Sequence, residues 1–311
     1  MTCLADVATY LPPRRVSIDD HLRGHGFSES RIRLHERYFG FSEIRFGAGT
    51  TLAEDLVAAG AALESLSRVR HRIRYVLHGR TMPVVAPYPA NPLQEARRKL
   101  GLEHAQAFSV TQHACASSLL AVDLAGRMLA GAGDEEGLVL VLSGEKAFTS
   151  CAQVIVNSGV MGEGTTAVLV GADGRRDRML SYATRTYGEF HDGAWLSEEA
   201  EEHFQQLYPS ALAEVIRAAT EHAGLELDQI ELILPHNVNR MSWLRVLRRL
   251  GLRRVDRLFL DNLPRTGHCF GADAFANYRT ARDQGRLQPG HKYVMTAVGL
   301  GATFSAMTFE H

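Results

Sequence analysis

The spacing of apolar and polar residues predicts helices and strands that alternate along the chain. The longest apolar pattern begins with strand character at 108–111 and continues with helical spacing to Ala130. Short apolar runs predict further strands at 2–10, 73–77, 138–142, 230–234, 258–260, 292–298 and 302–309. Capping residues and helical spacing predict helices at 17–23, 28–38, 51–66, 197–223, 242–250 and 272–284. This alternation is typical of an α/β protein with buried sheets.

Two similar halves are suggested by an internal likeness between distant segments. Gly-Glu-Gly-Thr-Thr at 162–166 and Gly-Leu-Gly-Ala-Thr at 299–303 each lead into a predicted strand. The charged, irregular segment 173–196 is the expected linker, which predicts an N-terminal half over 1–172 and a C-terminal half over 173–311. Duplication of one α/β unit explains the likeness, and chance similarity of five residues is the alternative.

Composition narrows the class of protein. The 311 residues are 45% hydrophobic and 22% charged, as in ordinary globular proteins, and the net charge of −1 gives no bulk attraction to nucleic acid or an anionic membrane. The four cysteines lie far apart without a Cys-x-x-Cys pair, which excludes a disulfide framework and favours a reducing compartment. The start of the chain lacks a signal-peptide pattern, and we expect a cytoplasmic protein with no membrane span.

Cys115 is the first candidate for chemistry, because it lies where a predicted strand meets a predicted helix. Unpaired backbone N–H groups and the positive end of the helix dipole favour a thiolate over a thiol at such a position. The thiolate is a nucleophile. The alternative is a buried structural cysteine packed among small residues, since Ala114, Ala116 and Ser117 surround it.

Two histidines occupy comparable junctions downstream. His236 follows the apolar strand predicted at 230–234, and His268 follows Gly267 before a predicted helix. A cysteine and two imidazoles at strand-to-helix junctions suit acyl chemistry on a thioester, in which the thiolate attacks and the imidazoles handle protons or a developing oxyanion. Each histidine alone could also be a surface or buried structural residue. A zinc site including Cys269 lacks the usual ligand spacing, so we expect no metal.

These segments resemble the thiolase superfamily, and within it the β-ketoacyl-acyl-carrier-protein synthase III group of condensing enzymes. YLPPRRVS resembles the opening strand and turn of that family, and HACASS resembles its nucleophile segment. GEGTTAVLV is similar to its G-D-G-x-x-A-x-x-L element, LPHNVN to its P-H-Q-A-N element, and AVGLGATFSA to its terminal glycine loop. The five matches occur in the family's order and span nearly the whole chain.

The resemblance implies an α-β-α-β-α layered fold of two similar halves, usually assembled as a homodimer. It implies that Cys115 carries an acyl group, that the amides of Cys115 and Gly301 form an oxyanion hole, and that His236 is the first imidazole. Asn239 matches the family's asparagine. Tyr88 falls where the family often has an aromatic residue that reaches across the dimer to the acyl chain.

One departure separates this chain from the synthase III pattern. Where that group has asparagine in G-N-x-x-x-A, the chain has His268 in G-H-C-F-G-A-D, so that Cys115, His236 and His268 resemble a Cys-His-His triad. Asp273 follows five residues later and either orients a histidine or simply favours the start of a helix. His113, two residues before Cys115, is unusual for the family and is expected to face the pocket. These departures indicate a specialised substrate.

We therefore predict an acyltransferase of synthase III type in fatty acid, polyketide or specialised metabolism. An acyl group from coenzyme A or an acyl carrier protein is loaded on Cys115 and condensed with a malonyl-type thioester by decarboxylation. Transfer to a hydroxyl or amine is the alternative, and a non-catalytic thiolase-fold partner is the second. No cofactor beyond the thioester substrate is expected. Six arginines could meet the phosphates of coenzyme A or an acidic carrier protein, or simply be solvated: Arg240, Arg245, Arg248, Arg249, Arg253 and Arg254.

Overall fold

A nine-stranded mixed sheet organises the computed structural model, which describes residues 1–155, 157–172, 174 and 176–311. The strand order is β11-β12-β13-β10-β1-β9-β6-β4-β5. The nine strands are Cys3–Tyr10 (β1), Ile73–Gly79 (β4), Gln106–Val110 (β5), Leu138–Ser143 (β6), Thr165–Gly171 (β9), Arg178–Thr186 (β10), Ile230–Leu234 (β11), Lys292–Gly299 (β12) and Thr303–Glu310 (β13). Two small sheets pair Arg14–Ser17 (β2) with Glu43–Phe46 (β3), and Val154–Ile155 (β7) with Gly159–Val160 (β8).

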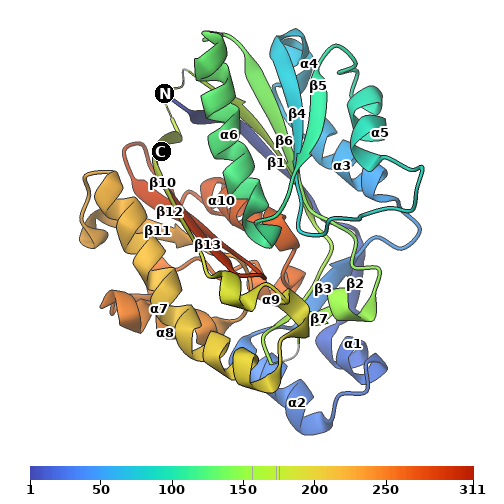
Figure 1. Cartoon of the computed structure of the whole chain (residues 1–311), viewed down its shortest axis with the longest axis vertical. Coiled ribbons are helices and arrows are strands. Elements are labelled where there is room, and N and C mark those ends of the chain that lie inside the picture. Colours follow the sequence, from blue (N-terminus) through green and yellow to red (C-terminus); the bar gives the residue numbers. More distant parts are fainter. Residues whose placement is uncertain (156, 173, 175) are drawn as a thin grey trace.

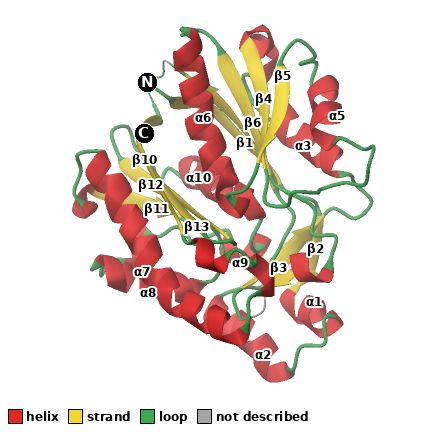
Figure 2. Cartoon of the chain, in the orientation of Figure 1, coloured by secondary structure: helices red, strands yellow, loops and turns green. Residues whose placement is uncertain are grey.

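α-Helices cover both faces of each part of the main sheet. The helices are Ile18–Gly24 (α1), Glu29–Leu34 (α2), Leu52–Ala61 (α3), Leu66–Val69 (α4), Pro92–Lys99 (α5), Ser117–Ala132 (α6), Glu198–His222 (α7), Arg240–Leu250 (α8), Leu263–Thr266 (α9) and Asp273–Asp283 (α10). Of these, α1, α2 and α9 pack beside the small β2–β3 sheet. Figure 1 shows α6 and α10 between the two parts of the sheet, α3 and α5 beside the N-terminal strands, and α7 and α8 beside the C-terminal strands. The secondary-structure colouring of Figure 2 makes these layers visible.

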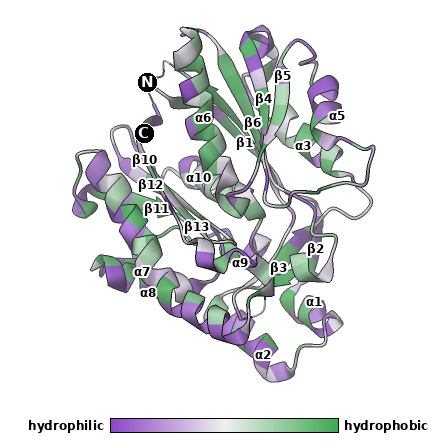
Figure 3. Ribbon diagram, viewed as in Figure 1, coloured by the Kyte–Doolittle hydropathy of each residue, from purple (hydrophilic) through white to green (hydrophobic). Residues whose placement is uncertain are grey.

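Three apolar cores hold the layers together. The central core joins α6 and α10 to both parts of the sheet, and includes Leu119, Phe275 and Met295. A second core packs α7 and α8 on the C-terminal strands, and a third packs α3 and α5 on the N-terminal strands. Figure 3 shows hydrophobic residues concentrated on the strands and α6, and hydrophilic residues on outward helices such as α2. The predicted α-β-α-β-α layering is confirmed.

The two parts of the sheet repeat one pairing pattern. In the N-terminal part, β4 and β6 are parallel, and β6–β9 and β9–β1 are antiparallel. In the C-terminal part, β11 and β12 are parallel, and β12–β13 and β13–β10 are antiparallel. The parts meet where Cys3 of β1 lies opposite Arg178 of β10. The predicted boundary at residue 173 falls outside the described residues and stays a prediction.

Several local predictions were wrong for identifiable reasons. The expected linker contains the nine-residue strand β10. Its arginines made the segment look like a polar loop, but Arg178 pairs with Glu310 and Arg185 pairs with Glu214. The expected strand at 258–260 is a single bridge between Leu258 and Ile233. The helix predicted over 51–66 divides into α3 and α4.

The apolar segment containing Cys115 is a core helix in this fold. Among the described residues, one helical stretch, Ala114–Ala132, is long and apolar enough to cross a membrane by length and composition alone. Most of that stretch is buried inside the protein, against both parts of the sheet.

A buried polar network ties the end of the chain to the sheet. The carboxylate of Asp177 accepts hydrogen bonds from the hydroxyls of Tyr278 at 2.5 Å and Tyr293 at 2.8 Å, and His311 Nδ1 lies 2.8 Å away. These partners come from α10, β12 and the last residue of the chain. Removing the carboxylate would leave buried donors without an acceptor, which costs more than the loss of one exposed bond.

We expect Asp177→Ala to lower the free energy of unfolding by about 3 kcal/mol, because hydrogen bonds to a buried charge are strong and their loss leaves unsatisfied groups. Urea denaturation followed by circular dichroism measures the change. Asp192→Ala, at an exposed carboxylate, is the control. A change below about 0.5 kcal/mol for Asp177→Ala, the range of an ordinary surface substitution, would contradict this account of the network.

Candidate active site

Cys115 lies in a strained turn between β5 and α6. A short 3₁₀ turn, Ala114–Ala116, precedes α6, and Cys115 within it is buried. Gln112 has φ 78° and Ala114 has φ 45°, the left-handed conformation that residues with a side chain rarely adopt. Such strain persists where surrounding structure holds it, and it is common at functional sites. The prediction that Cys115 begins the core helix is confirmed in position.

Two glycines let neighbouring segments press against this turn. A β-carbon at Gly299, the last residue of β12, would lie 1.9 Å from the carbonyl oxygen of His113. A β-carbon at Gly271, just before α10, would lie 2.2 Å from Ser118 Oγ. Both approaches exclude any larger residue. The C-terminal part of the chain therefore reaches the nucleophile turn through backbone contact.

The sulfur of Cys115 has one hydroxyl neighbour and an apolar wall. Thr81 Oγ1 donates a hydrogen bond to Cys115 Sγ at 3.3 Å, and the wall includes Met161 and Phe270. Glu145 holds Thr81 in place by accepting a hydrogen bond from its backbone N–H. Burial raises the pKa of Glu145 to about 7, although the amides of Thr81 and Met82 oppose the shift. The thiol thus meets a positioned donor rather than bulk water.

His268 connects the sulfur to a buried carboxylate. Its Nδ1 contacts Asp273 Oδ2, and its ring also forms a hydrogen bond with Cys115. Burial lowers the pKa of His268, but Asp273 and then Cys115 raise it, to a net value of about 10. Because Asp273 holds Nδ1, the other ring nitrogen faces the sulfur, the arrangement of a nucleophile, a base and an orienting acid.

Asp273 is fixed by four polar contacts, although it is the first residue of α10. Its Oδ1 accepts from the N–H of Cys269 at 2.8 Å, and its Oδ2 accepts from the N–H of Asn237 at 2.6 Å. The side chain of Asn237 also donates to Oδ1, and His268 completes the set. Asn277 in turn donates to Asn237 Oδ1 at 2.9 Å. A carboxylate held in this way is more than a charge at the start of a helix.

The Gly-Glu-Gly segment supports His268 from the other side. A β-carbon at Gly162 would lie 1.9 Å from the carbonyl oxygen of Thr266, and the N–H of Gly162 donates to the carbonyl oxygen of His268 at 3.0 Å. Glu163 binds Lys146 at 2.7 Å and accepts from the N–H of Gly47 at 2.8 Å. This motif therefore holds loops together beneath the site.

His236 lies beside His268, with the two ring centres 6.1 Å apart. Tyr208 Oη, from α7, lies 2.5 Å from His236 Nε2, and the ring of Trp243 packs against the imidazole at 5.4 Å. Burial, and then the nearby His268, lower the pKa of His236 well below its usual value, so its ring is neutral. Its Nδ1 is buried and has no hydrogen-bond partner among the described residues.

The structure brings Cys115, His236, His268 and Asp273 together, whereas Asn239 has a structural contact and His113 flanks the turn that contains Cys115. Asn239 caps α8 by accepting from the N–H of Ser242 at 2.7 Å, and donates to Ser158. His113 is half-buried at the nucleophile turn, and burial lowers its pKa.

Two further predicted residues occupy turns. Gly301 lies in the turn between β12 and β13, two residues from the glycine that touches His113. Tyr88 is 98% exposed on the loop between β4 and α5. Their predicted roles, in an oxyanion hole and across a dimer, stay predictions.

Sequence reasoning missed three residues of the site: Tyr208, Thr81 and Glu145. Each lies in an element whose sequence pattern carries no catalytic signal, and Tyr208 is 28 positions from the histidine it contacts. Asn237, within the LPHNVN segment, was not predicted as a site residue. Its polar side chain directly after a buried strand was the available signal.

A cleft of about 590 Å³ opens beside the site. Phe204, Ile155 and Leu300 line its apolar part, and His25, Cys151 and Glu201 line its polar part. Ile155 also packs against the Cys115 cluster, and the ring of Phe204 lies 5.8 Å from that of Tyr208. The cleft therefore shares Ile155 with the apolar cluster around the sulfur, and Phe204 connects it to Tyr208.

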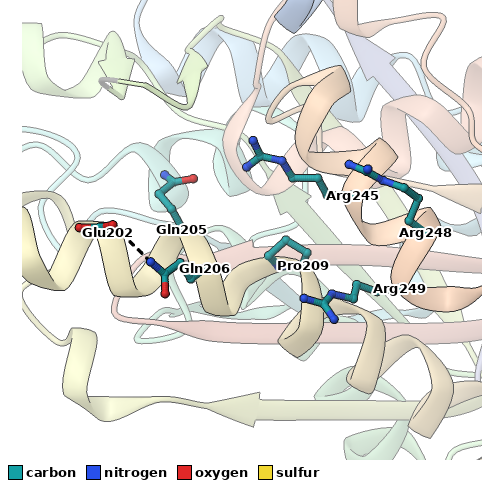
Figure 4. A pocket seen from close by; sticks show the side chains of 7 residues that line it. All are labelled: Glu202, Gln205, Gln206, Pro209, Arg245, Arg248 and Arg249. Atoms are coloured by element: carbon teal, nitrogen blue, oxygen red, sulfur yellow. Dashed lines mark hydrogen bonds between the residues drawn. The ribbon is translucent and has the colours of Figure 1, made fainter.

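A second, open groove of about 800 Å³ lies between α7 and α8. Figure 4 shows Arg245, Arg248 and Arg249 from α8 facing the residues of α7 that line it, Glu202, Gln205, Gln206 and Pro209. Of the other predicted arginines, Arg240 donates to the carbonyl of Arg37 and Arg254 pairs with Asp256. In the part of the chain that the structure describes, no group of three or more His, Cys, Asp or Glu residues could hold a metal ion.

Comparisons with known proteins agree with this geometry. Residues 220–311 match the family model for the C-terminal part of 3-oxoacyl-[acyl-carrier-protein] synthase III. The β-ketoacyl-[acyl-carrier-protein] synthase III of Rhizorhabdus wittichii is 27% identical over 97% of this chain and 96% of its own length.

Two solved structures share the fold. The acyltransferase ChlB3 has a TM-score of 0.84 at 20% identity, covering 99% of this chain and 97% of ChlB3. The priming β-ketosynthase of the R1128 polyketide biosynthetic pathway has a TM-score of 0.83 at 18% identity, covering 100% of this chain and 96% of that enzyme. The chain is therefore similar in sequence to β-ketoacyl-acyl-carrier-protein synthase III enzymes, and it shares the fold of these solved structures.

Proposed function

We propose that the protein transfers an acyl group from a thioester, through Cys115, to a hydroxyl or amine. The observation that carries this proposal is the buried contact between Asp273 and His268. The ring of His268 also forms a hydrogen bond with the sulfur of Cys115. A histidine oriented by a carboxylate is suited to remove a proton from an acceptor. The fold-related ChlB3 is an acyltransferase, which agrees with the proposal.

In the first step, the Cys115 thiolate attacks the thioester carbonyl. The carbon–sulfur bond of the donor breaks, and the departing thiolate takes the proton held by His268. Thr81, which donates to the sulfur, favours the charged nucleophile before attack. Backbone N–H groups of the nucleophile turn and of the turn at Gly301 are the proposed donors to the developing oxyanion.

In the second step, neutral His268 accepts the proton of the incoming hydroxyl or amine. The oxygen or nitrogen bonds to the acyl carbon, the carbon–sulfur bond to Cys115 breaks, and the sulfur leaves as a thiolate beside the imidazolium. Asp273 stabilises that imidazolium and fixes which ring nitrogen faces the acceptor. The active site returns to its starting charges.

Decarboxylative condensation is the second candidate, favoured by the proximity of His236 and His268. Two N–H donors at one thioester oxygen would stabilise the enolate formed as carbon dioxide leaves. The polyketide priming ketosynthase among the fold relatives agrees with this candidate and with a role in specialised metabolism. A non-catalytic partner is disfavoured, because the nucleophile and both histidines converge.

The donor is proposed to be a coenzyme A or acyl-carrier-protein thioester. The arginine groove between α7 and α8 offers three guanidinium groups to phosphates or to an acidic carrier surface. We also propose a homodimer. Tyr88 and Val84 are exposed on the loop between β4 and α5, and Phe108 is exposed on the edge strand β5, which leaves apolar surface on the N-terminal part.

Incubation with acyl thioesters should produce a covalent acyl adduct on Cys115, seen by intact-protein mass spectrometry and absent from Cys115→Ala. Adding a hydroxyl or amine acceptor should discharge the adduct without release of carbon dioxide. Cys151→Ala, at an exposed thiol, is the control and should keep the adduct. Discharge only by malonyl thioesters, with stoichiometric carbon dioxide, would favour condensation instead.

Asp273→Asn should slow discharge of the acyl-enzyme at neutral pH by about 100-fold, within the usual range for loss of assisted base catalysis. Asp273 raises the pKa of His268, so its removal lowers that pKa. Because the base must be deprotonated, the rise of the discharge rate with pH should move to lower pH in the variant.

Single-turnover discharge measured between about pH 5 and 10 tests both effects, because this range includes the pH values at which histidines usually titrate. Asp19→Asn, another aspartate in the first turn of a helix, is the matched control and should behave as the wild type. An unchanged rate and pH profile in Asp273→Asn would restrict Asp273 to stabilising α10.

A further inference from the structure

The contact between Tyr208 and His236 is the strongest feature that the proposed reaction does not use. Tyr208 lies on α7 immediately before Pro209 and is buried. Its ring packs edge-on against Phe204 and Phe304, with ring centres 5.8 Å and 5.7 Å away. This packing fixes the direction of the Tyr208 hydroxyl, which lies 2.5 Å from His236 Nε2.

The two histidines differ in how their ring nitrogens are engaged. At His268, Asp273 holds Nδ1 and leaves the other nitrogen toward the sulfur. At His236, the engaged nitrogen is Nε2, and Nδ1 has no partner among the described residues. A neutral imidazole carries one proton, and the nitrogen that accepts a hydrogen bond is the one without it.

A phenol O–H is a better hydrogen-bond donor than a neutral imidazole N–H, and the unprotonated imidazole nitrogen is a better acceptor than the phenol oxygen. The favoured arrangement is therefore Tyr208 O–H donating to His236 Nε2, with the ring proton on Nδ1. His236 in that tautomer presents no N–H from Nε2. Its Nε2 therefore cannot serve as the second donor to a thioester enolate.

We propose that Tyr208 is a specificity-determining positioning residue, which holds His236 in the tautomer that cannot support decarboxylation of a malonyl thioester. Decarboxylation breaks the bond between the carboxylate carbon and the α-carbon, and the electron pair moves onto the thioester oxygen as an enolate. With His236 Nε2 occupied, only His268 remains to stabilise that oxygen. The site is thereby biased toward heteroatom acceptors, so this inference rests on the proposed function.

Removing the hydroxyl of Tyr208 should leave Nε2 of His236 free to carry the ring proton. In Tyr208→Phe the packing surface is kept and Nε2 can carry the proton, so release of carbon dioxide from a malonyl thioester should increase at least about 5-fold, the effect of roughly one lost hydrogen bond. The rate is normalised to the acylated fraction of Cys115. The gain should disappear in the double variant Tyr208→Phe/His236→Ala.

Tyr187→Phe is the matched control, because that ring also packs edge-on against Phe304, but its hydroxyl donates to the exposed Glu214 of α7 and not to His236. It should release carbon dioxide at the wild-type rate. Equal or slower release in folded Tyr208→Phe would overturn the proposal. Failure of the proposed function is a separate result, seen when wild-type acyl-enzyme does not discharge to hydroxyl or amine acceptors.

A spectroscopic measurement on the wild-type protein tests the tautomer without any variant. The ¹⁵N shifts of His236 should show Nε2 as a hydrogen-bond acceptor and Nδ1 as the protonated nitrogen. A change of tautomer in Tyr208→Phe, with the ¹⁵N shifts of His268 retained, would support a positioning role. A proton on Nε2 in the wild type would overturn it.

Discussion

The buried carboxylate of Asp273 is the constraint on which the site depends. Four polar contacts hold it, and its contact with His268 Nδ1 determines which nitrogen of that ring faces Cys115. A buried carboxylate is costly unless its lone pairs are satisfied, and here backbone amides, an asparagine and an imidazole satisfy them. Burial lowers the pKa of His268, but Asp273 and then Cys115 raise it, to a net value of about 10. The site thus pairs a cation with the sulfur of Cys115.

The layered fold supplies this constraint by bringing two distant parts of the chain to one point. Cys115 comes from the start of α6 in the central layer, and Asp273 begins α10 in the same layer. Glycines at 271 and 299 allow the backbone contacts that a larger residue would prevent. The N–H of Gly162, in the Gly-Glu-Gly segment, then holds the carbonyl oxygen of His268 by a hydrogen bond. Catalytic geometry here follows from close packing between layers rather than from a mobile loop.

Sequence reasoning located the residues that follow a recognisable pattern. Cys115 follows β5 and His236 follows β11, each before a helix, as the sequence predicts. His268 instead lies between α9 and α10, because the strand expected at 258–260 is a single bridge. The structure places the three side chains close together. For Asp273 the sequence left two explanations, because only the fold shows that its carboxylate turns inward. Tyr208 was missed, since a tyrosine on the apolar side of a long helix looks like any core residue. Strand β10 was missed because it carries charged residues that are paired in the fold, Arg178 with Glu310 of β13 and Arg185 with Glu214 of α7.

The central claim is that Asp273 keeps His268 as a cation beside Cys115, and the most direct test is the protonation state of His268 in the unacylated enzyme. Histidine ¹⁵N spectra at about pH 8, above the usual range for an imidazole, report this state. The account predicts that both nitrogens of His268 carry protons in the wild type, and that one proton is lost in Asp273→Asn. A neutral His268 in the wild-type enzyme at that pH would contradict it.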